Sequence, residues 1–512
     1  MENLNNKSAA ANVSARPESP KVGSANCAPG SPDIENAKAG QSEQKAAHDG
    51  GSIRIDIEKP DSGNIVRDEV WLMCTVVKWC FIAIVTGIAV GLVAGGFLLA
   101  LRCAMGFSAS LGALHYLLLF PGLLLSYYLV RMLAPQSAGH GTEAVIDAIH
   151  NRRRTLIDVK AVPVKIVATI ATISSGGSVG IEGPCAQIGS GVSYLLGRLF
   201  NLDESDMKKI IICGIAAGFC AVFGTPVAGA IFAVEVLFVG QIFYDVLLPA
   251  LISGIVGYFT AAAIGAGHLP SYLVEIPPVG PGALAMVLIA GVFFGLVAII
   301  NIEGIHFVNK LFVYYRITGW KRPVGGAVLL LATGVLFGGD FLGLGSDVIQ
   351  SMVMGERNLP LGFIIKIAAM GITLSAGGCG GEITPTLFVG ASSGLLFAAI
   401  FGLDPSFCAA LGVSAVLAAS TNTPISGTIL AMELFGAHIA AFAGAACAAS
   451  YLVVGHRSLY PTQVLLSPKS RTFVIKKTEG GEQLVRRFDS ISLRRIVRFY
   501  LERIKAKLIE RR

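Results

Sequence analysis

Long apolar stretches, separated by short polar or glycine-rich links, run through most of the chain. They lie at 70–104, 110–133, 161–176, 184–200, 208–223, 226–240, 242–265, 280–302, 325–343, 360–376, 385–402, 406–419, 423–436 and 438–455. Several are shorter than the roughly twenty residues that a full membrane span requires. This predicts helices that are tilted or that stop inside a bilayer. Backbone groups at such breaks must face protein or a watery cavity, because lipid cannot satisfy them.

One pattern of lysine, glycine, proline and glutamate occurs twice. Lys165 and Lys366 each precede a proline by nineteen residues, and a later proline precedes Glu235 and Glu433 by nine. The two copies are Lys165, Gly176, Gly177, Gly180, Glu182, Pro184, Gly189, Thr225, Pro226, Gly229 and Glu235, and Lys366, Gly377, Gly378, Gly381, Glu382, Pro385, Gly390, Thr423, Pro424, Gly427 and Glu433. Glycine-rich membrane helices can look alike for packing reasons alone. Matched spacing of Lys, Pro and Glu instead indicates an internal repeat of the transporter kind, with its site where the broken helices meet.

Composition agrees with a membrane location. Of the 512 residues, 53% are hydrophobic and 14% are charged, and the mean hydropathy is +0.67. We expect an all-α, multi-pass membrane protein with a transport domain at 67–466, containing repeats at about 110–265 and 325–466. The polar segment 1–66 contains no apolar run long enough for a signal peptide and is predicted to be a disordered tail.

The segment 467–512 is strongly basic. From Lys469 to Arg512 it carries fourteen Lys/Arg and five Asp/Glu. Its net charge of +9 (14 − 5) exceeds the net charge of +7 of the whole chain. Such a tail is expected on the cytoplasmic side. Apolar residues recur in it at helical spacing, which favours a helix on an anionic membrane surface over nucleic-acid binding. These residues are Leu493, Ile496, Val497, Tyr500, Leu501, Ile504 and Leu508.

The run GGSVGIEGPCAQIGSG at 176–191 predicts a helix start that is able to bind an anion. Unpaired N–H groups and the macrodipole stabilise a negative charge there by up to about 2 kcal/mol. Glu182 lies where that anion would bind, so it is either a gate that also carries protons or a simple helix cap. In the second copy, Glu382 is either functional or paired with a buried base such as Lys366.

Two further residues are candidates for contact with the same ion. His140, in GHGTEAVIDAIH at 139–150, opens a predicted short helix, and the basic run at 152–154 that follows it suggests the cytoplasmic side. His140 is either a hydrogen-bond donor to an anion or a cap. Tyr460, in GHRSLYPTQVL at 455–465, is at the start of another predicted short helix. It either offers its phenol to the ion or is a membrane-interface tyrosine.

At these residues the chain resembles the CLC family of chloride channels and chloride/proton antiporters, over about 67–466. The family motif G-[KR]-E-G-P is matched at 180–184, with Ile181 in place of the basic residue, which implies that Glu182 is the gating glutamate. The motif G-S-G-x-P is matched at 139–143, with His140 in place of the anion-coordinating serine and Glu143 in place of the proline. The motif G-x-F-x-P is matched at 381–385, with Ile383 in place of phenylalanine.

The resemblance implies a fold, a site and a location. It implies two inverted-topology repeats with discontinuous, tilted helices, a homodimer with one pore per subunit, and a multi-pass protein of the plasma or inner membrane with both termini cytoplasmic. Tyr460 matches the tyrosine of the family's central site. The implied anion-binding residues are Gly139, His140, Gly141, Gly183, Glu382, Ile383 and Tyr460. The C-terminal tail is too short for a regulatory nucleotide-binding domain.

Two departures bear on the mechanism. Proton-coupled members usually place an internal glutamate just after the position of Glu235, where this chain has Val236, so channel and antiporter both remain open. Glu382 and the loss of the serine are similar to fluoride/proton antiporters of the family. Chloride is the expected ion and fluoride the alternative, and protons are a possible second substrate.

Other functional classes are disfavoured. A membrane-embedded enzyme using Glu182 and Glu235 as acid and base would want a nucleophile or metal cluster of recognisable spacing, and the ten cysteines and eight histidines show none. No cofactor, metal or nucleic-acid partner is predicted. An organic-anion transporter should carry more basic residues in its apolar segments than Lys165 and Lys366.

Overall fold

A computed structural model of the protein describes residues 65–150, 157–266, 272, 274–466, 469, 473–478 and 481–486. These parts of the chain are almost entirely helical, which confirms the predicted all-α class. Six helical stretches among them are long and apolar enough to cross a bilayer, and five shorter apolar helices accompany them. The prediction that many helices fall short of a full span is therefore confirmed. The predicted basic helix at 493–508 and the tail at 1–64 lie outside the described residues.

Two series of seven helices follow one another in the same order. The first series is α3 (Leu119–Leu133), α4 (Thr142–His150), α5 (Ala161–Ser174), α6 (Glu182–Leu199), α7 (Glu204–Phe223), α8 (Pro226–Glu235) and α9 (Tyr244–Ala263). The second series is α11 (Lys321–Phe337), α12 (Ser346–Val353), α13 (Gly362–Ser375), α14 (Ile383–Phe401), α15 (Pro405–Thr421), α16 (Pro424–Phe435) and α17 (Ala440–Val454). Each series follows a long helix, α2 (Ile65–Ser110) or α10 (Pro281–Tyr314). The 3-10 turns are η1 (Gly112–Leu118), η2 (Pro135–Ser137), η3 (Gly339–Phe341) and η4 (Ala437–Ile439).

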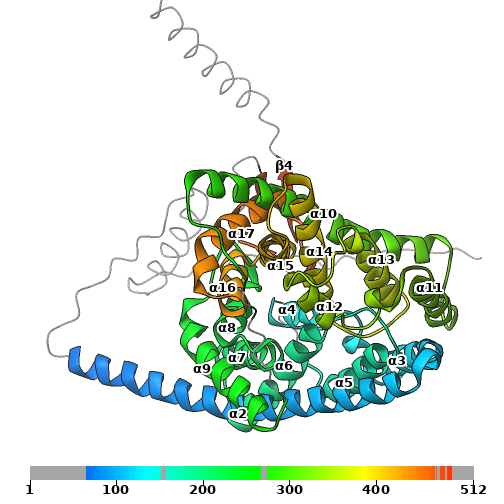
Figure 1. Ribbon diagram of the computed structural model, residues 1–512. Coiled ribbons are helices and arrows are strands. Elements are labelled where there is room, and N and C mark those ends of the chain that lie inside the picture. The colour runs from blue at the N-terminus through cyan, green and yellow to red at the C-terminus, as the bar shows by residue number, and fades with distance from the viewer. Residues whose placement is uncertain are drawn as a thin grey trace, which may run out of the picture. The chain divides into compact units, whose positions relative to one another are not determined.

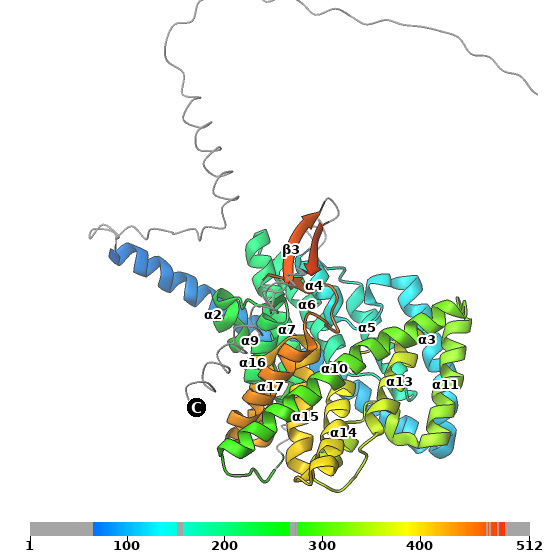
Figure 2. The same ribbon diagram turned by 90° about the horizontal axis from the view of Figure 1, so that it is seen from above.

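The two series pack internally in the same way. Helix α6 packs along α7 as α14 packs along α15, and both pairs are visible in two views (Figure 1 and Figure 2). Likewise α3 contacts α5 as α11 contacts α13, and α7 contacts α8 and α9 as α15 contacts α16 and α17. The series meet where α8 packs on α16 and where α6 approaches α14. The structure is therefore that of two inverted repeats joined along a pseudo-two-fold axis.

Small residues set the distance between these helices. A Cβ added to Gly189 in α6 would lie 2.1 Å from the carbonyl oxygen of Gly214 in α7. A Cβ added to Gly390 in α14 would lie 2.3 Å from the carbonyl oxygen of Gly412 in α15. Helices that touch backbone to backbone need glycine at the crossing. The largest buried apolar cluster, which includes residues of α7, α10, α14, α15 and α17, surrounds these crossings.

Three regions differ from the sequence prediction. Helix α10 continues to Tyr314, beyond the apolar stretch that ends at 302, because helical hydrogen bonds do not require apolar side chains once the helix has begun. The helix expected at 455–465 is wrong. That segment is a turn followed by strand β2 (Val464–Leu465), which pairs in parallel with β1 (Phe238–Val239). In the basic tail, β3 (Phe473–Thr478) and β4 (Gly481–Arg486) form an antiparallel hairpin that the sequence analysis did not predict.

Candidate functional site

The two glycine-rich motifs meet directly. The backbone N–H of Gly180 donates to the carbonyl of Gly381, and the N–H of Gly381 donates to the carbonyl of Gly180, each at 2.6 Å. A reciprocal pair of this kind places the pseudo-two-fold axis between the two residues. Helices α6 and α14 each begin two residues later. The structure therefore brings the starts of two broken helices together, as the repeat predicted.

Matched threonines hold this crossing from both sides. The N–H of Ser178 donates to the hydroxyl of Thr373 in α13 at 3.0 Å, and the N–H of Cys379 donates to the hydroxyl of Thr172 in α5 at 3.0 Å. All four groups are buried. Neither threonine was predicted from the sequence, although each lies seven residues after the matched lysine of its repeat and eight residues before Gly180 or Gly381.

Glu182 caps a helix of the other repeat. It is the first residue of α6 and is 2% exposed. Its Oε2 accepts the backbone N–H of Thr384 at 3.2 Å, and its Oε1 accepts the Thr384 hydroxyl. Thr384 is the second residue of α14, so the carboxylate occupies the positive end of that helix. The capping alternative thus applies to α14, at a place where an anion would bind.

A cavity of about 530 Å³ reaches Glu182 and is called the Glu182 cavity below. Thr384, Ile181, Arg102 and Asp347 also line it. The guanidinium of Arg102 donates to the backbone carbonyls at 265 and 266, at 3.0 and 2.7 Å. Ile181 occupies the position where the CLC motif has a basic residue. Arg102, from helix α2, therefore places a cation at the cavity that the local motif lacks.

The glycine-flanked turn before α4 contacts the start of α6. Gly139 and Gly141 have φ values of 71° and 80°, in the left-handed region that favours glycine. A Cβ on Gly141 would lie 2.5 Å from the carbonyl oxygen of Gly183, and a Cβ on Gly183 would lie 2.0 Å from that of His140. The same added Cβ on Gly183 would lie 3.1 Å from the Cα of Gly381. Three predicted segments therefore touch through their backbones, and a side chain at these glycines would separate them.

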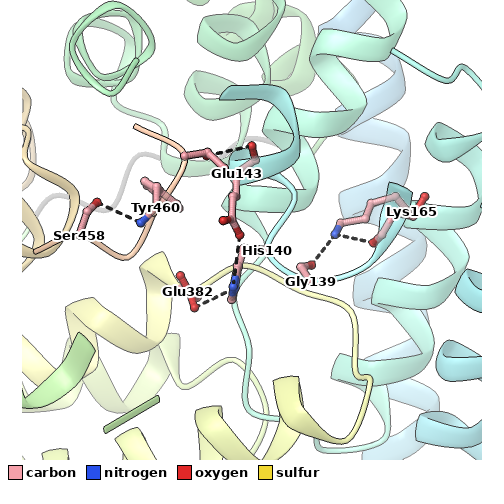
Figure 3. Close-up of polar contacts among 9 residues, drawn as sticks. Gly139, His140, Glu143, Lys165, Glu382, Ser458 and Tyr460 are labelled. Carbon is pink, nitrogen blue, oxygen red and sulfur yellow. Dashed lines mark hydrogen bonds and ion pairs between the residues drawn. The ribbon is translucent and has the colours of Figure 1, made fainter. Parts of the chain in front are cut away.

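His140 lies between two carboxylates (Figure 3). Its Nδ1 is 2.8 Å from Oε1 of Glu382, and its Nε2 is 3.9 Å from Oε2 of Glu143. Glu382 is 2% exposed, and its Oε2 has no hydrogen-bond partner in the described part of the chain. His140 and Glu382 were both predicted as site residues, but their pairing was not. Glu143 was noted only as a departure from the family proline.

The two buried lysines bind backbone rather than carboxylates. Lys165 donates to the carbonyl of Gly139 at 2.7 Å and to a second carbonyl in η2 at 3.1 Å (Figure 3). Lys366 donates to the carbonyl of Gly343 at 3.1 Å and to a second one in η3 at 3.3 Å. Each lysine fixes the turn that precedes α4 or α12. The alternative that Lys366 pairs with Glu382 is therefore not what the structure shows.

Tyr460 is 1% exposed, which is inconsistent with a membrane-interface tyrosine. Its backbone N–H donates to the hydroxyl oxygen of Ser458 at 3.0 Å (Figure 3). The side chain is close enough to Glu382 and Glu182 to interact with both electrostatically. Tyr460 also lines a second cavity of about 360 Å³, called the Tyr460 cavity below, together with His306.

A polar network holds the turn that carries Tyr460. Beyond the last membrane helix, the ammonium of Lys469 donates to Oδ1 of Asn422 at 2.6 Å and to the carbonyl of Tyr451 at 2.8 Å. Burial lowers the pKa of Lys469 to about 7. Asn422 donates to Gln463 at 3.1 Å, and Gln463 donates to the carbonyl of Val236 at 2.6 Å. These side chains connect the 455–466 turn to the ends of α15 and α8.

The matched glutamates late in each repeat cap helices of the opposite repeat. Glu433 accepts the N–H groups of Val227 and Ala228 at the start of α8, at 3.0 and 2.8 Å. Glu235 accepts the equivalent pair at the start of α16, also at 3.0 and 2.8 Å. The equal Pro-to-Glu spacing of the two copies thus has a structural explanation. Val236, the next residue, is fully buried and apolar.

The predicted site residues thus lie at or beside the starts of α6 and α14, and Tyr460 interacts electrostatically with Glu182 and Glu382. Ile383 is the first residue of α14 and is fully buried. The contact that sequence reasoning missed most clearly is that of Thr384 with Glu182. A hydroxyl two residues after Glu382, inside the second motif, was the available signal.

Known proteins share this architecture. The family model described as voltage gated chloride channel matches residues 122–455. A chloride/fluoride channel protein of Pseudomonas syringae pv. tomato is 33% identical over 406 residues, covering 77% of this chain and 87% of that protein. A voltage-gated ClC-type chloride channel, ClcB, of Shigella flexneri is 29% identical over 291 residues, covering 54% of this chain and 69% of its own length.

Solved structures agree in fold. The crystal structure of a CLC-type fluoride/proton antiporter superposes with a TM-score of 0.71 at 27% identity, covering 76% of this chain and 98% of that one. A slow cyanobacterial Cl⁻/H⁺ antiporter superposes with a TM-score of 0.67 at 21% identity, covering 73% of this chain and 94% of the other, and at that identity it supports the fold alone.

Proposed function

The chain belongs to the voltage-gated chloride channel (CLC) family, and from this premise we propose that it moves chloride across a membrane through the α6–α14 crossing, with Glu182 as the gate. The transport domain would comprise residues 67–466. The observation that carries the proposal is the contact of the Glu182 carboxylate with the first turn of α14. A carboxylate held there competes with any anion for the same N–H groups.

The gate works by this competition. With Glu182 charged and bound to Thr384, the start of α14 is occupied and the Glu182 cavity ends at a carboxylate. Protonation removes the negative charge and with it most of the attraction to the helix start. The side chain then leaves, and an anion takes its place. A proton bound at Glu182 can also travel with the side chain, so one residue is able to gate and to carry protons.

Anion binding would rely on partial charges. Gly183, Glu382 and Ile383 lie at the starts of α6 and α14, where backbone N–H groups lack helical acceptors. Tyr460 offers a phenolic O–H from the side of the second cavity. Gly139 and Gly141 keep the α4 turn close enough to complete the site, and His140 faces it. Backbone dipoles replace hydration without the full charge of a lysine, which permits rapid release.

Fluoride/proton exchange is the second candidate. The observation in its favour is Glu382, a carboxylate inside the second motif that is 2% exposed. A buried negative charge repels any anion, and hydrogen bonds offset that repulsion better for fluoride than for a larger, more diffuse anion. The P. syringae relative is described as a chloride/fluoride channel protein, and the solved structure at 27% identity is a fluoride/proton antiporter. Both descriptions belong to those proteins and make the comparison of the two ions the decisive measurement here.

Membrane orientation and assembly complete the proposal. The basic residues of segments 152–154 and 469–512 favour a cytoplasmic location for both tails. The Tyr460 cavity, which contains Arg457 and lies next to the 455–466 turn, would then open to the cytoplasm, and the Glu182 cavity to the outside. By family membership we expect a homodimer with one pathway per subunit.

The test is flux from liposomes reconstituted with the full-length protein. Wild type should release chloride or fluoride, measured with ion-selective electrodes, and efflux should rise as pH falls. Glu182→Gln and Glu182→Ala should both transport with a flattened pH response. Glu204→Gln, at an exposed position in the first turn of α7, is the matched control and should behave as wild type. Wild-type pH response and rate in both Glu182 variants would exclude Glu182 as the gate.

A further inference from the structure

Several titratable side chains lie between the Tyr460 cavity and the Glu182 cavity. His306 lines the Tyr460 cavity and lies within electrostatic reach of Glu143. Glu143 faces Nε2 of His140, and Nδ1 of His140 faces Glu382. Glu382 stands two residues before Thr384, which holds Glu182. The sequence order of these groups gives no hint of the series, because they come from α10, the α4 turn, α4 and the start of α14.

The alternative carboxylate near the inner side is already engaged. Both oxygens of Glu235 accept backbone N–H groups at the start of α16, at 3.0 and 2.8 Å. The neighbouring Val236 is fully buried and has no group that can bind a proton. A proton route through this position would have to break a helix cap. The series through Glu143 and His140 requires no such rearrangement.

His140 has the chemistry of a relay. A neutral imidazole donates from one nitrogen and accepts at the other, and it changes charge near neutral pH. The charged groups that face it are Glu382, Glu143 and Lys165. The ammonium of Lys165 is bound by two backbone carbonyls, so the two carboxylates dominate the local field. Of the His140 side chain, 20% is exposed, compared with 31% of Glu143 and 2% of Glu382.

We propose that Glu143 and His140 are the entry path for protons between the Tyr460 cavity and Glu382, on the way to Glu182. This inference rests on the proposed function and adds proton coupling to it. The surroundings of Glu143 are compatible with loading from the cavity side, since Asp147, His306, His140 and Glu382 are the charged groups near it. Proton transfer needs direct contact or one bridging water. Nδ1 of His140 is within hydrogen-bond distance of Glu382 at 2.8 Å but lacks hydrogen-bond geometry, so a rotation of the ring must align this step, and the 3.9 Å step requires a small side-chain rotation or one water.

Each transfer conserves protons and charge. Protonated Glu143 gives its proton to Nε2 of His140, and the Nδ1 proton passes to Oε1 of Glu382. Glu143 returns to the carboxylate and Glu382 becomes the neutral acid. The imidazole, left with its proton on Nε2, regains the starting tautomer by exchange with water at its exposed edge. From Glu382 the proton reaches Glu182 through water when the anion site is occupied.

The experiment measures anion and proton fluxes separately in the same liposomes. An outward chloride gradient, and in parallel an outward fluoride gradient, drives anion efflux recorded with an ion-selective electrode, while a pH electrode records proton uptake. The variants are His140→Gln, which keeps hydrogen-bonding groups but cannot relay at neutral pH, and Glu143→Gln. Glu303→Gln is the matched control, because Glu303 lines the Tyr460 cavity and pairs with Arg457 but stands outside the series.

Glu143→Gln should keep anion efflux within about threefold of wild type and lose about a hundredfold or more of the proton flux, the lower end of what a single lost proton-transfer group costs. His140→Gln should lower the proton flux by a similar factor relative to its own anion efflux. Glu303→Gln should retain both fluxes. If His140→Gln also fails to transport anions, Glu143→Gln decides, because its partly exposed side chain is not needed for packing. An unchanged anion-to-proton ratio in Glu143→Gln overturns the inference. Anion efflux by the wild-type protein without any proton uptake also overturns the inference, but it leaves the proposed anion pathway intact. Absence of anion efflux from the wild-type protein overturns the proposed function itself.

Discussion

Removing one of the reciprocal glutamate caps should destabilise the protein by a predictable amount. Glu235→Ala takes away both acceptors for the first turn of α16, and Glu433→Ala does the same for α8. Neither change creates a collision, because alanine fits wherever the glutamate Cβ already lies. The two variants are equivalent by the repeat symmetry and differ in burial. Glu235 is 5% exposed, whereas Glu433 is half-buried.

The magnitude follows from the bonds that are lost. A hydrogen bond to a charged acceptor contributes about 1.5–3 kcal/mol when its partner remains buried. Loss of a helix N-cap costs about 0.5–2 kcal/mol. Because two bonds are lost but water partly replaces them, we expect Glu235→Ala to lower the free energy of unfolding by about 2–4 kcal/mol. Glu433→Ala should cost about half as much, since its site admits water. Glu235→Gln retains one acceptor oxygen and should fall between wild type and Glu235→Ala.

Unfolding in mixed micelles with increasing dodecyl sulfate, followed by circular dichroism, measures these differences. Glu303→Ala is the control, because Glu303 forms only an exposed pair with Arg457 at 3.0 Å and such pairs contribute about 0–1 kcal/mol. Two wild-type midpoints for the cap variants would refute the reasoning. So would a larger loss in Glu433→Ala than in Glu235→Ala, because it would contradict the dependence on burial.

Three further predictions address packing, the gate and pH. Gly390→Ala puts a Cβ 2.3 Å from a backbone oxygen of α15 and should prevent stable folding, whereas Gly96→Ala, with nothing within 4 Å, should give a wild-type elution profile in size-exclusion chromatography. Thr384→Val removes the hydroxyl that Glu182 accepts, so anion efflux at neutral pH should increase by several-fold, and an unchanged rate would contradict the gating contact. Because burial lowers the pKa of Lys469 to about 7, the unfolded chain binds the extra proton between that pH and about 10.5, and the thermal midpoint should rise with pH across this window. Lys469→Met should flatten that rise in a thermal-shift measurement.

The location of the site was predictable from the sequence because symmetry is visible in spacing. Matched lysines and prolines placed Gly180 and Gly381 at equivalent positions, and the two glycines form the bridge on the pseudo-two-fold axis. Short apolar segments correctly predicted helices that begin inside the protein. Both signals are properties of single segments, so they can be read from the sequence without knowing which segments pack together.

The partners of individual side chains were not predictable in the same way. Glu182 and Thr384 are 202 residues apart, and His140 and Glu382 lie on different repeats. The sequence around Glu182 does not indicate which helix of the other repeat this side chain will cap. The turn at 455–465 failed for a related reason. Its backbone is held by Ser420 and by side chains such as Gln463 rather than by its own helical hydrogen bonds.

The contacts of the two buried lysines leave the proposed anion pathway without a lysine at its centre. Lys165 and Lys366 are fully buried, yet each is bound to two backbone carbonyls of the turn before α4 or α12. In the proposed pathway an entering ion would therefore meet helix starts, each contributing up to about 2 kcal/mol, rather than a full positive charge. In the proposed mechanism, an attraction of that size is comparable for an anion and for the Glu182 carboxylate, and this near balance would allow the side chain and the ion to displace one another. A lysine side chain released into the site would bind any anion more strongly and slow its release.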